Sequence, residues 1–265
     1  MIVVKLGGSL LSSEAWKQVV REAASMGTVI LVHGGGHRVN SLGQRYGVEQ
    51  KFVTSPEGYR SRYTDWETME FFSMVMRGLV AMDILREMRA CGRDAISLTG
   101  LDMGLIRGER KKRLVVLNER GRRMVIDGGF TGRPTHLRAD VLTGIMSSGA
   151  VPVIAPIICG EENEPLNVDG DRLAAFIASR MRADALVLLT NVPGVVLDGQ
   201  VLNKIDRSNY DAVLQRVGNG MDKKLMAARE AVEGGARLAV IAQGSSENAI
   251  SRAISGASGT VVTWT

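Results

Sequence analysis

The first 37 residues, MIVVKLGGSLLSSEAWKQVVREAASMGTVILVHGGGH at 1–37, decide the expected architecture of the chain. Ile2 to Leu6 is a short apolar run typical of a buried strand, and a glycine pair follows it directly. A helical pattern over about 13–26 and a second apolar run, Thr28 to His33, come next, and three more glycines follow. This order predicts a β-α-β unit whose two strands lie parallel in one sheet.

The same alternation continues along the chain and predicts an α/β fold around a largely parallel sheet. Residues 94–131 differ, because charged turns with glycine separate their short apolar runs, and they are expected to form an antiparallel excursion. A long helix is expected over 66–90, with a bend at Gly78 and an apolar stripe that suits a core or a subunit interface. The other expected helices are 34–46, 137–148, 171–182, 221–233 and one from about 247, and the other expected strands are 96–98, 114–117, 124–126, 151–155, 185–189, 238–242 and 260–263.

The composition limits the class of protein. The chain has 265 residues, of which 45% are hydrophobic, enough for one large α/β unit or two closely coupled lobes. It lacks a cleavable leader pattern and any run of about 18 apolar residues, which predicts a soluble protein without a membrane partner. Cys91 and Cys159 lie beside apolar residues and outside metal-binding spacings, so both are expected to be buried free thiols in a reduced, cytoplasmic setting.

The charge is moderately basic, with a net charge of +5. A basic segment at 107–123 concentrates much of it, with cations at Arg107, Arg110, Lys111, Lys112, Arg113, Arg120, Arg122 and Arg123. This segment suits either an acidic partner or a solvated hairpin kept soluble by its charges. Nucleic acid is a poor candidate for the partner, because aromatic residues make up 5% of the chain and none interleaves with the basic residues.

Two glycine-rich strand exits are the first candidates for chemistry. Lys5 precedes Gly7 and Gly8, and His33 precedes the triple glycine 34–36. Glycines at such places let backbone N–H groups approach an anion, although tight turns and a lysine at the sheet margin would give the same pattern. His33 and His37 do not share a helical face and have no evident third partner, so a metal site is not expected there. Neither a P-loop nor a dinucleotide-binding glycine pattern is present.

Two polar clusters at predicted helix starts are the other candidates. Residues 165–171, PLNVDGD, place Asn167, Asp169 and Asp171 at the start of a helix, where helix capping would also explain the two carboxylates. Residues 220–224, GMDKK, place two lysines at the start of another helix, where cations are disfavoured. A bound anion would explain the lysines, and so would a flexible surface pair.

Six motifs occur in one order: KLGGS at 5–9, HGGG at 33–36, SRYTD at 61–65, NVDGD at 167–171, TNVPGV at 190–195 and GMDKK at 220–224. Through them the chain resembles the acetylglutamate kinase branch of the amino-acid kinase family over essentially its whole length. TSPEGYRSRYTD at 54–65 is most similar to the kinases that phosphorylate aminoadipate or glutamate attached to the carrier protein LysW in lysine or arginine synthesis. The resemblance implies a three-layer αβα sandwich with a central, mainly parallel sheet, the carbamate kinase-like fold.

The resemblance also implies roles for individual residues. Lys5 and Lys224 would stabilise the phosphoryl group in transfer, and Asp171 would hold both ammonium groups. The amino-acid substrate would bind to Gly35, Gly36, Arg62 and Asn167, and ATP would bind near Gly8, Thr190, Asn191, Gly194 and Met221. Magnesium would arrive bound to the ATP phosphates, with no metal site of protein ligands. The family often has asparagine at the position of Asp169, which leaves the role of that residue open.

The implied reaction needs no general base, because a side-chain carboxylate with a reference pKa near 4.3 is already ionised at neutral pH. Residues 1–182 would bind the amino acid and the acidic carrier, which would dock on the basic segment, and residues 183–265 would bind ATP. The long helix over 66–90 would suit a homodimer or a higher homo-oligomer. An N-acetylglutamate kinase that acts on the free amino acid stays open as an alternative, and so, more remotely, do a nucleic-acid-binding protein and a noncatalytic ligand sensor.

Overall fold

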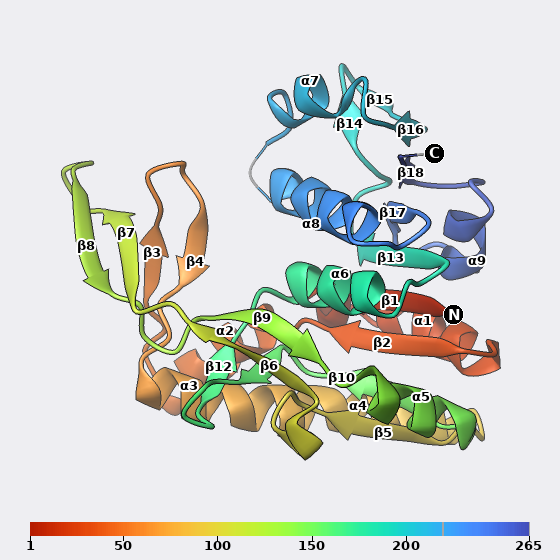
Figure 1. Cartoon of the computed structure of the whole chain (residues 1–265), viewed down its shortest axis with the longest axis horizontal. Helices are drawn as coiled ribbons and strands as arrows, with labels where there is room; N and C mark the ends of the chain where they lie inside the picture. Colours follow the sequence, from red (N-terminus) through yellow and green to blue (C-terminus); the bar gives the residue numbers. More distant parts are fainter. Residues whose placement is uncertain (219, 265) are drawn as a thin grey trace.

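The computed structural model describes residues 1–218 and 220–264, and an eight-stranded sheet lies at its centre (Figure 1). In spatial order the strands are β16 (Lys204–Ile205), β18 (Thr260–Val262), β17 (Ala239–Gln243), β13 (Ala185–Thr190), β1 (Ile2–Leu6), β2 (Val29–His33), β10 (Val151–Ile154) and β5 (Ala95–Leu98). All neighbouring pairs are parallel except β17 and β18. The mainly parallel sheet is thereby confirmed, and it contains strands from both of the predicted lobes.

β1 is the central strand, and its register aligns the predicted site residues. It pairs with β2 and β13, so that Lys5 stands opposite Val32 on one side and Leu188 on the other. Parallel strands end at the same edge of a sheet, and the loops after β1, β2 and β13 therefore meet at one place. The first predicted unit is confirmed, with α1 (Ala15–Ser25) between β1 and β2.

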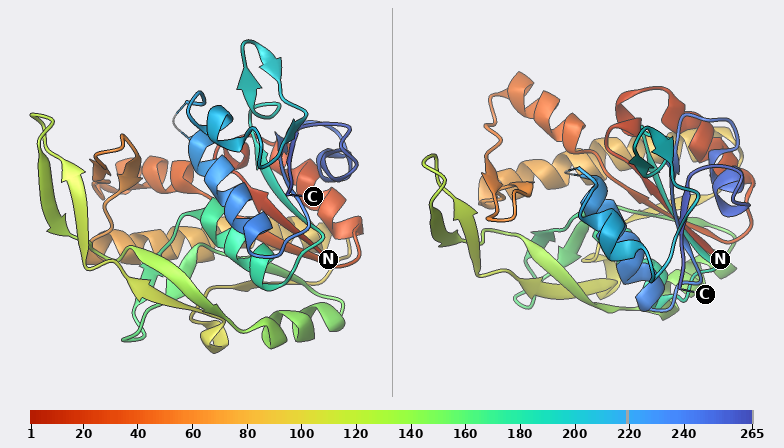
Figure 2. Two further views of the ribbon diagram at one scale, coloured as in Figure 1. Left: turned by 45° about the horizontal axis from the view of Figure 1, so that its top comes forward. Right: turned by 90° about the horizontal axis from the view of Figure 1, so that it is seen from above.

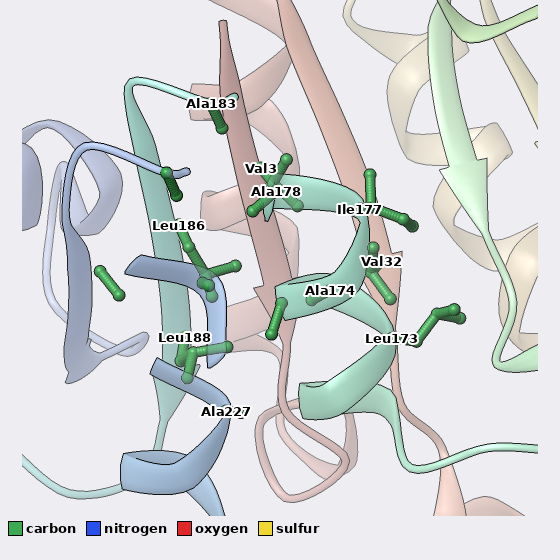
Figure 3. Packing of buried hydrophobic residues seen from close by; sticks show 14 of the residues in the cluster. Val3, Val32, Leu173, Ala174, Ile177, Ala178, Ala183, Leu186, Leu188 and Ala227 are labelled. Atoms are coloured by element: carbon green, nitrogen blue, oxygen red, sulfur yellow. The ribbon is translucent and has the colours of Figure 1, made fainter. Parts of the chain in front are cut away.

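Helices cover both faces of this sheet, as Figure 2 shows. Alternate residues of β1 face opposite cores: Val3 packs with α6 (Gly170–Arg180), and Val4 packs with α1. Figure 3 shows the first core, where Leu173, Ala174 and Ile177 of α6 lie on the strands. Other helices are α2 (Gly36–Tyr46), α5 (Ala139–Ser147), α7 (Tyr210–Leu214), α8 (Met221–Glu233) and α9 (Ala249–Ile254), with short 3-10 turns η1 (Leu10–Ser12) and η3 (Asp102–Gly104). The three-layer sandwich is confirmed.

The long helix over 66–90 is also present, in three contiguous pieces. α3 (Trp66–Ser73) is followed by the π-helical segment η2 (Met74–Val80) and then by α4 (Ala81–Ala90). The side chain of Asp65 caps its start by accepting from the N–H of Thr68 at 2.9 Å. Gly78 lies inside the π-helical segment, so the predicted irregularity is a local widening of the helix.

The antiparallel excursion predicted over 94–131 is confirmed in part. Its first strand was assigned wrongly, because β5 joins the edge of the central sheet and runs parallel to β10. The other strands form structures that extend beyond the predicted range. β6 (Ile106–Arg110) and β9 (Gly132–Leu137) form a four-stranded sheet with β11 (Ile157–Cys159) and β12 (Pro165–Asn167). The hairpin of β7 (Arg113–Leu117) and β8 (Arg123–Asp127) stands away from the central sheet beside the hairpin of β3 (Phe52–Thr54) and β4 (Arg60–Arg62) (Figure 1). A last short hairpin joins β14 (Val196–Leu197) to β15 (Gln200–Val201).

The cysteine prediction was half wrong. Cys159 is buried in β11, but Cys91 is exposed, because it lies beyond the last residue of α4 in a surface turn. Both thiols are free. None of the described helices is long and apolar enough to span a membrane.

Candidate active site

The two glycine-rich strand exits lie against each other at the carboxyl edge of the sheet. The N–H of Gly34 donates to the carbonyl of Leu6 at 2.8 Å, which joins the loop after β2 to the end of β1. A Cβ atom on Gly8 would lie 3.4 Å from the backbone nitrogen of Gly35 and 3.5 Å from that of Gly36. The backbone nitrogens of Gly8, Gly35 and Gly36 are therefore clustered, and Gly36 is also the first residue of a helix, where N–H groups lack intrahelical partners. Such a cluster can bind an anion.

The conformation at Gly35 explains why this loop needs glycine. Its φ of 151° is one that other residues rarely adopt, and a Cβ atom there would lie 2.8 Å from the sulfur of Met76. Glycine at this position therefore lets the loop pack directly on the long helix.

Beside the loops, one buried carboxylate holds two lysines. Asp171 Oδ1 lies 2.7 Å from Lys5 Nζ, and Asp171 Oδ2 lies 2.7 Å from Lys224 Nζ. The side chains of Lys5 and Asp171 are each 8% exposed, and that of Lys224 is 15% exposed. The three residues come from β1, the first turn of α6 and the first turn of α8. The structure thus brings the three predicted catalytic residues together with one net positive charge.

The electrostatics keep this cluster charged. Burial alone would raise the pKa of Asp171, but the positive charges of Lys5 and Lys224 hold it well below its usual range. Burial and the charge of Lys5 lower the pKa of Lys224, and the charge of Asp171 opposes that shift. The cluster has two positive charges and one negative charge, and an incoming polyphosphate would balance the excess positive charge.

Arg62 lies on the other side of the glycine loops. Its guanidinium donates to Asn40 Oδ1 at 2.7 Å, to the carbonyl of Gly36 at 3.3 Å and to the side chain of Gln50. Within the described ranges it pairs with no carboxylate, and burial lowers its pKa to about 10. A half-buried guanidinium whose hydrogen-bond acceptors are all neutral oxygens suits an incoming carboxylate, since Arg can bind both carboxylate oxygens.

Asn167 and Asp169 have different partners. The side-chain amide of Asn167 donates to Thr64 Oγ1 at 3.0 Å, which links the NVDGD and SRYTD motifs. Asp169 caps α6 by accepting from the N–H groups of Asp171 and Arg172 at 2.9 and 3.1 Å. Capping therefore accounts for Asp169, and it also fixes the helix turn that carries Asp171.

Apart from Gly8, the residues predicted to bind the nucleotide lie at the end of β13 or after it in the chain. Thr190 ends β13 beside Gly7, and its hydroxyl donates to Asn191 Oδ1 at 3.3 Å. Met221 is the first residue of α8, next to the lysines. Gly194 has its own packing reason, because a Cβ atom there would lie 2.7 Å from Thr260 Oγ1. Thr190 thus lies beside the loop after β1, Met221 lies in the helix turn that carries Lys224, and Gly194 packs against β18.

The sequence interpretation assigned His33 no role beyond the rejected metal site. Its side chain is fully buried, Nδ1 donates to the carbonyl of Gly34 at 2.9 Å, and Nε2 has no hydrogen-bond partner among the described residues. Burial lowers its pKa to about 4, so the ring is neutral at pH 7. His33 therefore holds the glycine loop in place, a role that its position directly before the loop could have indicated.

Comparisons with known proteins agree with this geometry. Residues 1–243 match the sequence model of the amino acid kinase family. The chain is 44% identical over 264 residues to a putative [LysW]-aminoadipate/[LysW]-glutamate kinase of Cenarchaeum symbiosum (strain A), with 99% of each chain covered. It is 40% identical over 263 residues to the [LysW]-aminoadipate/[LysW]-glutamate kinase of Saccharolobus solfataricus, again with 99% of each chain covered.

Solved structures with lower identity share the fold. A carbamate kinase from Giardia lamblia bound to AMP-PNP superimposes with a TM-score of 0.68 at 16% identity, over 100% of this chain and 98% of that one. The N-acetylglutamate synthase of Neisseria gonorrhoeae gives a TM-score of 0.79 at 16% identity over 99% of this chain, which spans only 61% of the synthase. The fold, the clustered motifs and the full-length relatives agree, and the chain belongs to the amino acid kinase family and is an amino-acid kinase.

Proposed function

We propose that this kinase moves the γ-phosphoryl group of ATP onto the side-chain carboxylate of a carrier-linked amino acid, 2-aminoadipate or glutamate, and so forms an acyl phosphate. The observation that supports this proposal most directly is the Lys5–Asp171–Lys224 cluster beside the clustered N–H groups of Gly8 and Gly35. Phosphoryl transfer depends on positioning and on stabilisation of negative charge, and these groups provide both. An acyl phosphate that hydroxylamine traps is the product that tests the reaction.

We propose a separate role for each side of the cluster. Residues 183–265 would bind ATP, with Gly8 from the other lobe and with Thr190, Asn191, Gly194 and Met221 near the nucleotide. Residues 1–182 would bind the amino acid, with Gly35, Gly36, Arg62 and Asn167 around it. The Arg62 guanidinium, which has no carboxylate partner in the described chain, supports the second assignment. Magnesium would enter bound to the phosphates of ATP and would neutralise part of their charge.

A carrier-linked substrate is favoured by two independent observations. Both relatives described above are named for substrates attached to LysW. The β7–β8 hairpin carries exposed cations that form no ion pair within the described residues, at Lys112, Arg113, Arg120, Arg122 and Arg123. Val115, Met124 and Val125 on the same hairpin are 44–61% exposed. Unpaired cations beside exposed apolar groups suit the docking of an acidic protein.

Neutralising the hairpin tests the carrier. In the triple variant Arg120→Gln/Arg122→Gln/Arg123→Gln, the KM for LysW carrying a C-terminal glutamate or aminoadipate is expected to rise at least tenfold at low salt, while kcat stays unchanged. The reason is that charges on the rim of an interface act mainly on association. The matched control is Arg252→Gln on α9, a site on another part of the surface. An unchanged KM for the carrier would exclude docking at this hairpin.

An N-acetylglutamate kinase that acts on the free amino acid is the second candidate, because Arg62 would grip the carboxylate of either substrate. The unpaired cations of the basic segment favour the carrier over this candidate. If the enzyme also used carrier-linked glutamate, it would serve arginine synthesis in addition to lysine synthesis.

We also propose a homodimer across the long helix. Met74, Leu79 and Met82 are 62%, 48% and 53% exposed along η2 and α4, and Ile96 of the edge strand β5 is 42% exposed. Exposed apolar side chains along one helix and the adjacent edge strand favour association. Sedimentation of the Met82→Lys variant as a monomer would support this interface, and an unchanged dimer would contradict it.

The two free cysteines support a cytoplasmic location.

A further inference from the structure

The hairpin β3–β4 and the first turn of α8 meet across the candidate active site, although 163 residues separate them in the sequence. Lys223 Nζ donates to the backbone carbonyl of Arg60 at 3.0 Å, and it lies 5.6 Å from the centre of the Tyr59 ring. The lysine thus reaches from the helix to the end of the hairpin by one hydrogen bond and one cation–π contact.

The helix side of this contact is fixed. Asp222 is buried, and its Oδ1 accepts from the N–H of Gly220 at 2.8 Å and from the N–H of Lys223 at 2.6 Å. These two bonds hold the backbone from which Lys223 projects. Burial and the charge of Asp222 also raise the pKa of Tyr59, and the hydrogen bond between their side chains is a second contact between the hairpin and the helix.

Apart from the bridge, the hairpin is held by Arg62, which donates to Asn40 and to the carbonyl of Gly36, and by the contact of β3 with β7. A two-stranded hairpin is only marginally stable alone, so its position depends on contacts with the body of the protein. A cavity of about 230 Å³ lies between hairpin and helix, lined by Gly58, Tyr59, Arg60, Gly220 and Lys223. Side chains therefore do not fill this contact, and the Lys223 bridge joins the two elements in place of close packing.

Each end of the bridge lies next to a residue of the transfer site. Arg60 and Arg62 are two residues apart on β4 and so share a face, and both guanidinium groups lie over the ring of Phe52 at 4.3 and 5.1 Å. Lys223 directly precedes Lys224, which pairs with Asp171. A shift of the hairpin relative to α8 would move Arg62 away from the lysine cluster.

We propose that Lys223 is a positioning residue, which seats the β3–β4 hairpin on α8 so that Arg62 presents the amino-acid substrate to Lys5 and Lys224. The assignment rests on the proposed role of Arg62 in substrate binding. It accounts for the first lysine of the GMDKK motif by a contact with the protein itself and not by a contact with phosphate.

Hydrogen exchange tests the bridge without any substrate. In Lys223→Met, the amides of residues 52–62 are expected to exchange about fivefold faster, because one net hydrogen bond of ordinary strength is lost. Amides of the neighbouring hairpin 113–127 should not change. Lys223→Arg keeps a cation and a donor and should stay within about twofold of the parent protein. Lys204→Met, at an exposed lysine of β16, is the matched control.

Kinetics with the carrier-linked substrate give the second readout. Lys223→Met is expected to raise the KM for the amino-acid substrate about fivefold, while the KM for ATP and kcat stay within about twofold of the parent values. In Lys223→Arg, the KM for the amino-acid substrate should be close to that of the parent enzyme. A rise in the KM for ATP would instead make Lys223 a phosphate ligand and overturn the proposal. Unchanged exchange over 52–62 would also overturn it, even if the parent enzyme used a different substrate, since that measurement needs no turnover.

Discussion

Asp171 contacts Lys5 and Lys224 at the same distance, 2.7 Å, through its two separate carboxylate oxygens. Lys5 comes from the central strand and Lys224 from a helix that begins more than 200 residues later. One carboxylate therefore sets the spacing of two cations that the order of the chain leaves far apart. Two ammonium groups so close together would repel each other without it.

Asp171→Asn removes the charge and keeps the shape of the side chain. We expect it to destabilise the fold by about 3–5 kcal/mol, because it leaves two buried cations without a counter-charge, and to lower kcat at least about a hundredfold. Denaturant unfolding and steady-state kinetics measure the two effects. Asp169→Asn is the control, since asparagine caps helices as well as aspartate does and the lysine pairs remain. Equal losses in both variants would contradict the account.

Lys224→Met removes one of the two cations. We expect kcat to fall about 10²–10³-fold, the cost of removing one group that stabilises charge in the transition state. The KM values should change much less, in contrast to those of Lys223→Met. A normal kcat in Lys224→Met would show that the transferring phosphoryl group lies elsewhere.

Gly8→Ala tests the N–H cluster. The new methyl group would lie 3.4 Å from the nitrogen of Gly35, an ordinary contact, so the protein should fold with nearly unchanged stability. It would nevertheless cover the N–H groups, and we expect kcat/KM for ATP to fall at least about tenfold. Gly27→Ala is the control, because nothing lies within 4 Å of a Cβ atom there. If Gly8→Ala had the kinetics of the parent enzyme, the N–H cluster would not be part of the phosphate-binding site.

His33 predicts a specific dependence of stability on pH. Its pKa in the folded protein is about 4, below its ordinary value of 6.5. Between these two pH values, His33 is therefore protonated in the unfolded chain and neutral in the folded protein. The free energy of unfolding should fall by about 2 kcal/mol between pH 7 and pH 5 from this group. Asp171, whose pKa is lowered from 3.8, loses its contribution only at still lower pH.

The variant His33→Gln isolates that contribution. Its free energy of unfolding should lack this fall between pH 7 and pH 5, whatever its stability at pH 7. The exposed His136→Gln should keep the slope of the parent protein. Parallel curves for the parent protein and His33→Gln would rule out a buried neutral histidine.

Much of the fold follows from local pattern. The strands around Lys5 and His33 were predicted because both faces of a central parallel strand are buried, which makes the whole strand apolar. The β3–β4 hairpin was missed, since its strands are three residues long and carry no alternation: Arg60, Ser61 and Arg62 are all polar. The strand β12, with the sequence PLN, was also missed, because it begins with a proline, which strands tolerate only at a sheet edge or at their first position.

The site was predictable through its motifs, but its contacts were not. Lysines at the start of α8 indicated an anion, and the structure supplies two different acceptors, Asp171 for Lys224 and the carbonyl of Arg60 for Lys223. Which lysine takes which acceptor depends on the packing of α6, α8 and the hairpin. Sequence patterns describe neighbours along the chain and cannot give such pairings.

The most direct test of the central claim is acyl-phosphate formation, trapped by hydroxylamine, with ATP and magnesium. The substrates to compare are LysW carrying a C-terminal aminoadipate or glutamate, and free N-acetylglutamate. The account predicts hydroxamate from the carrier-linked substrates and little or none from N-acetylglutamate. Hydroxamate from N-acetylglutamate alone would contradict the carrier assignment, and its absence with every substrate would contradict the proposed reaction.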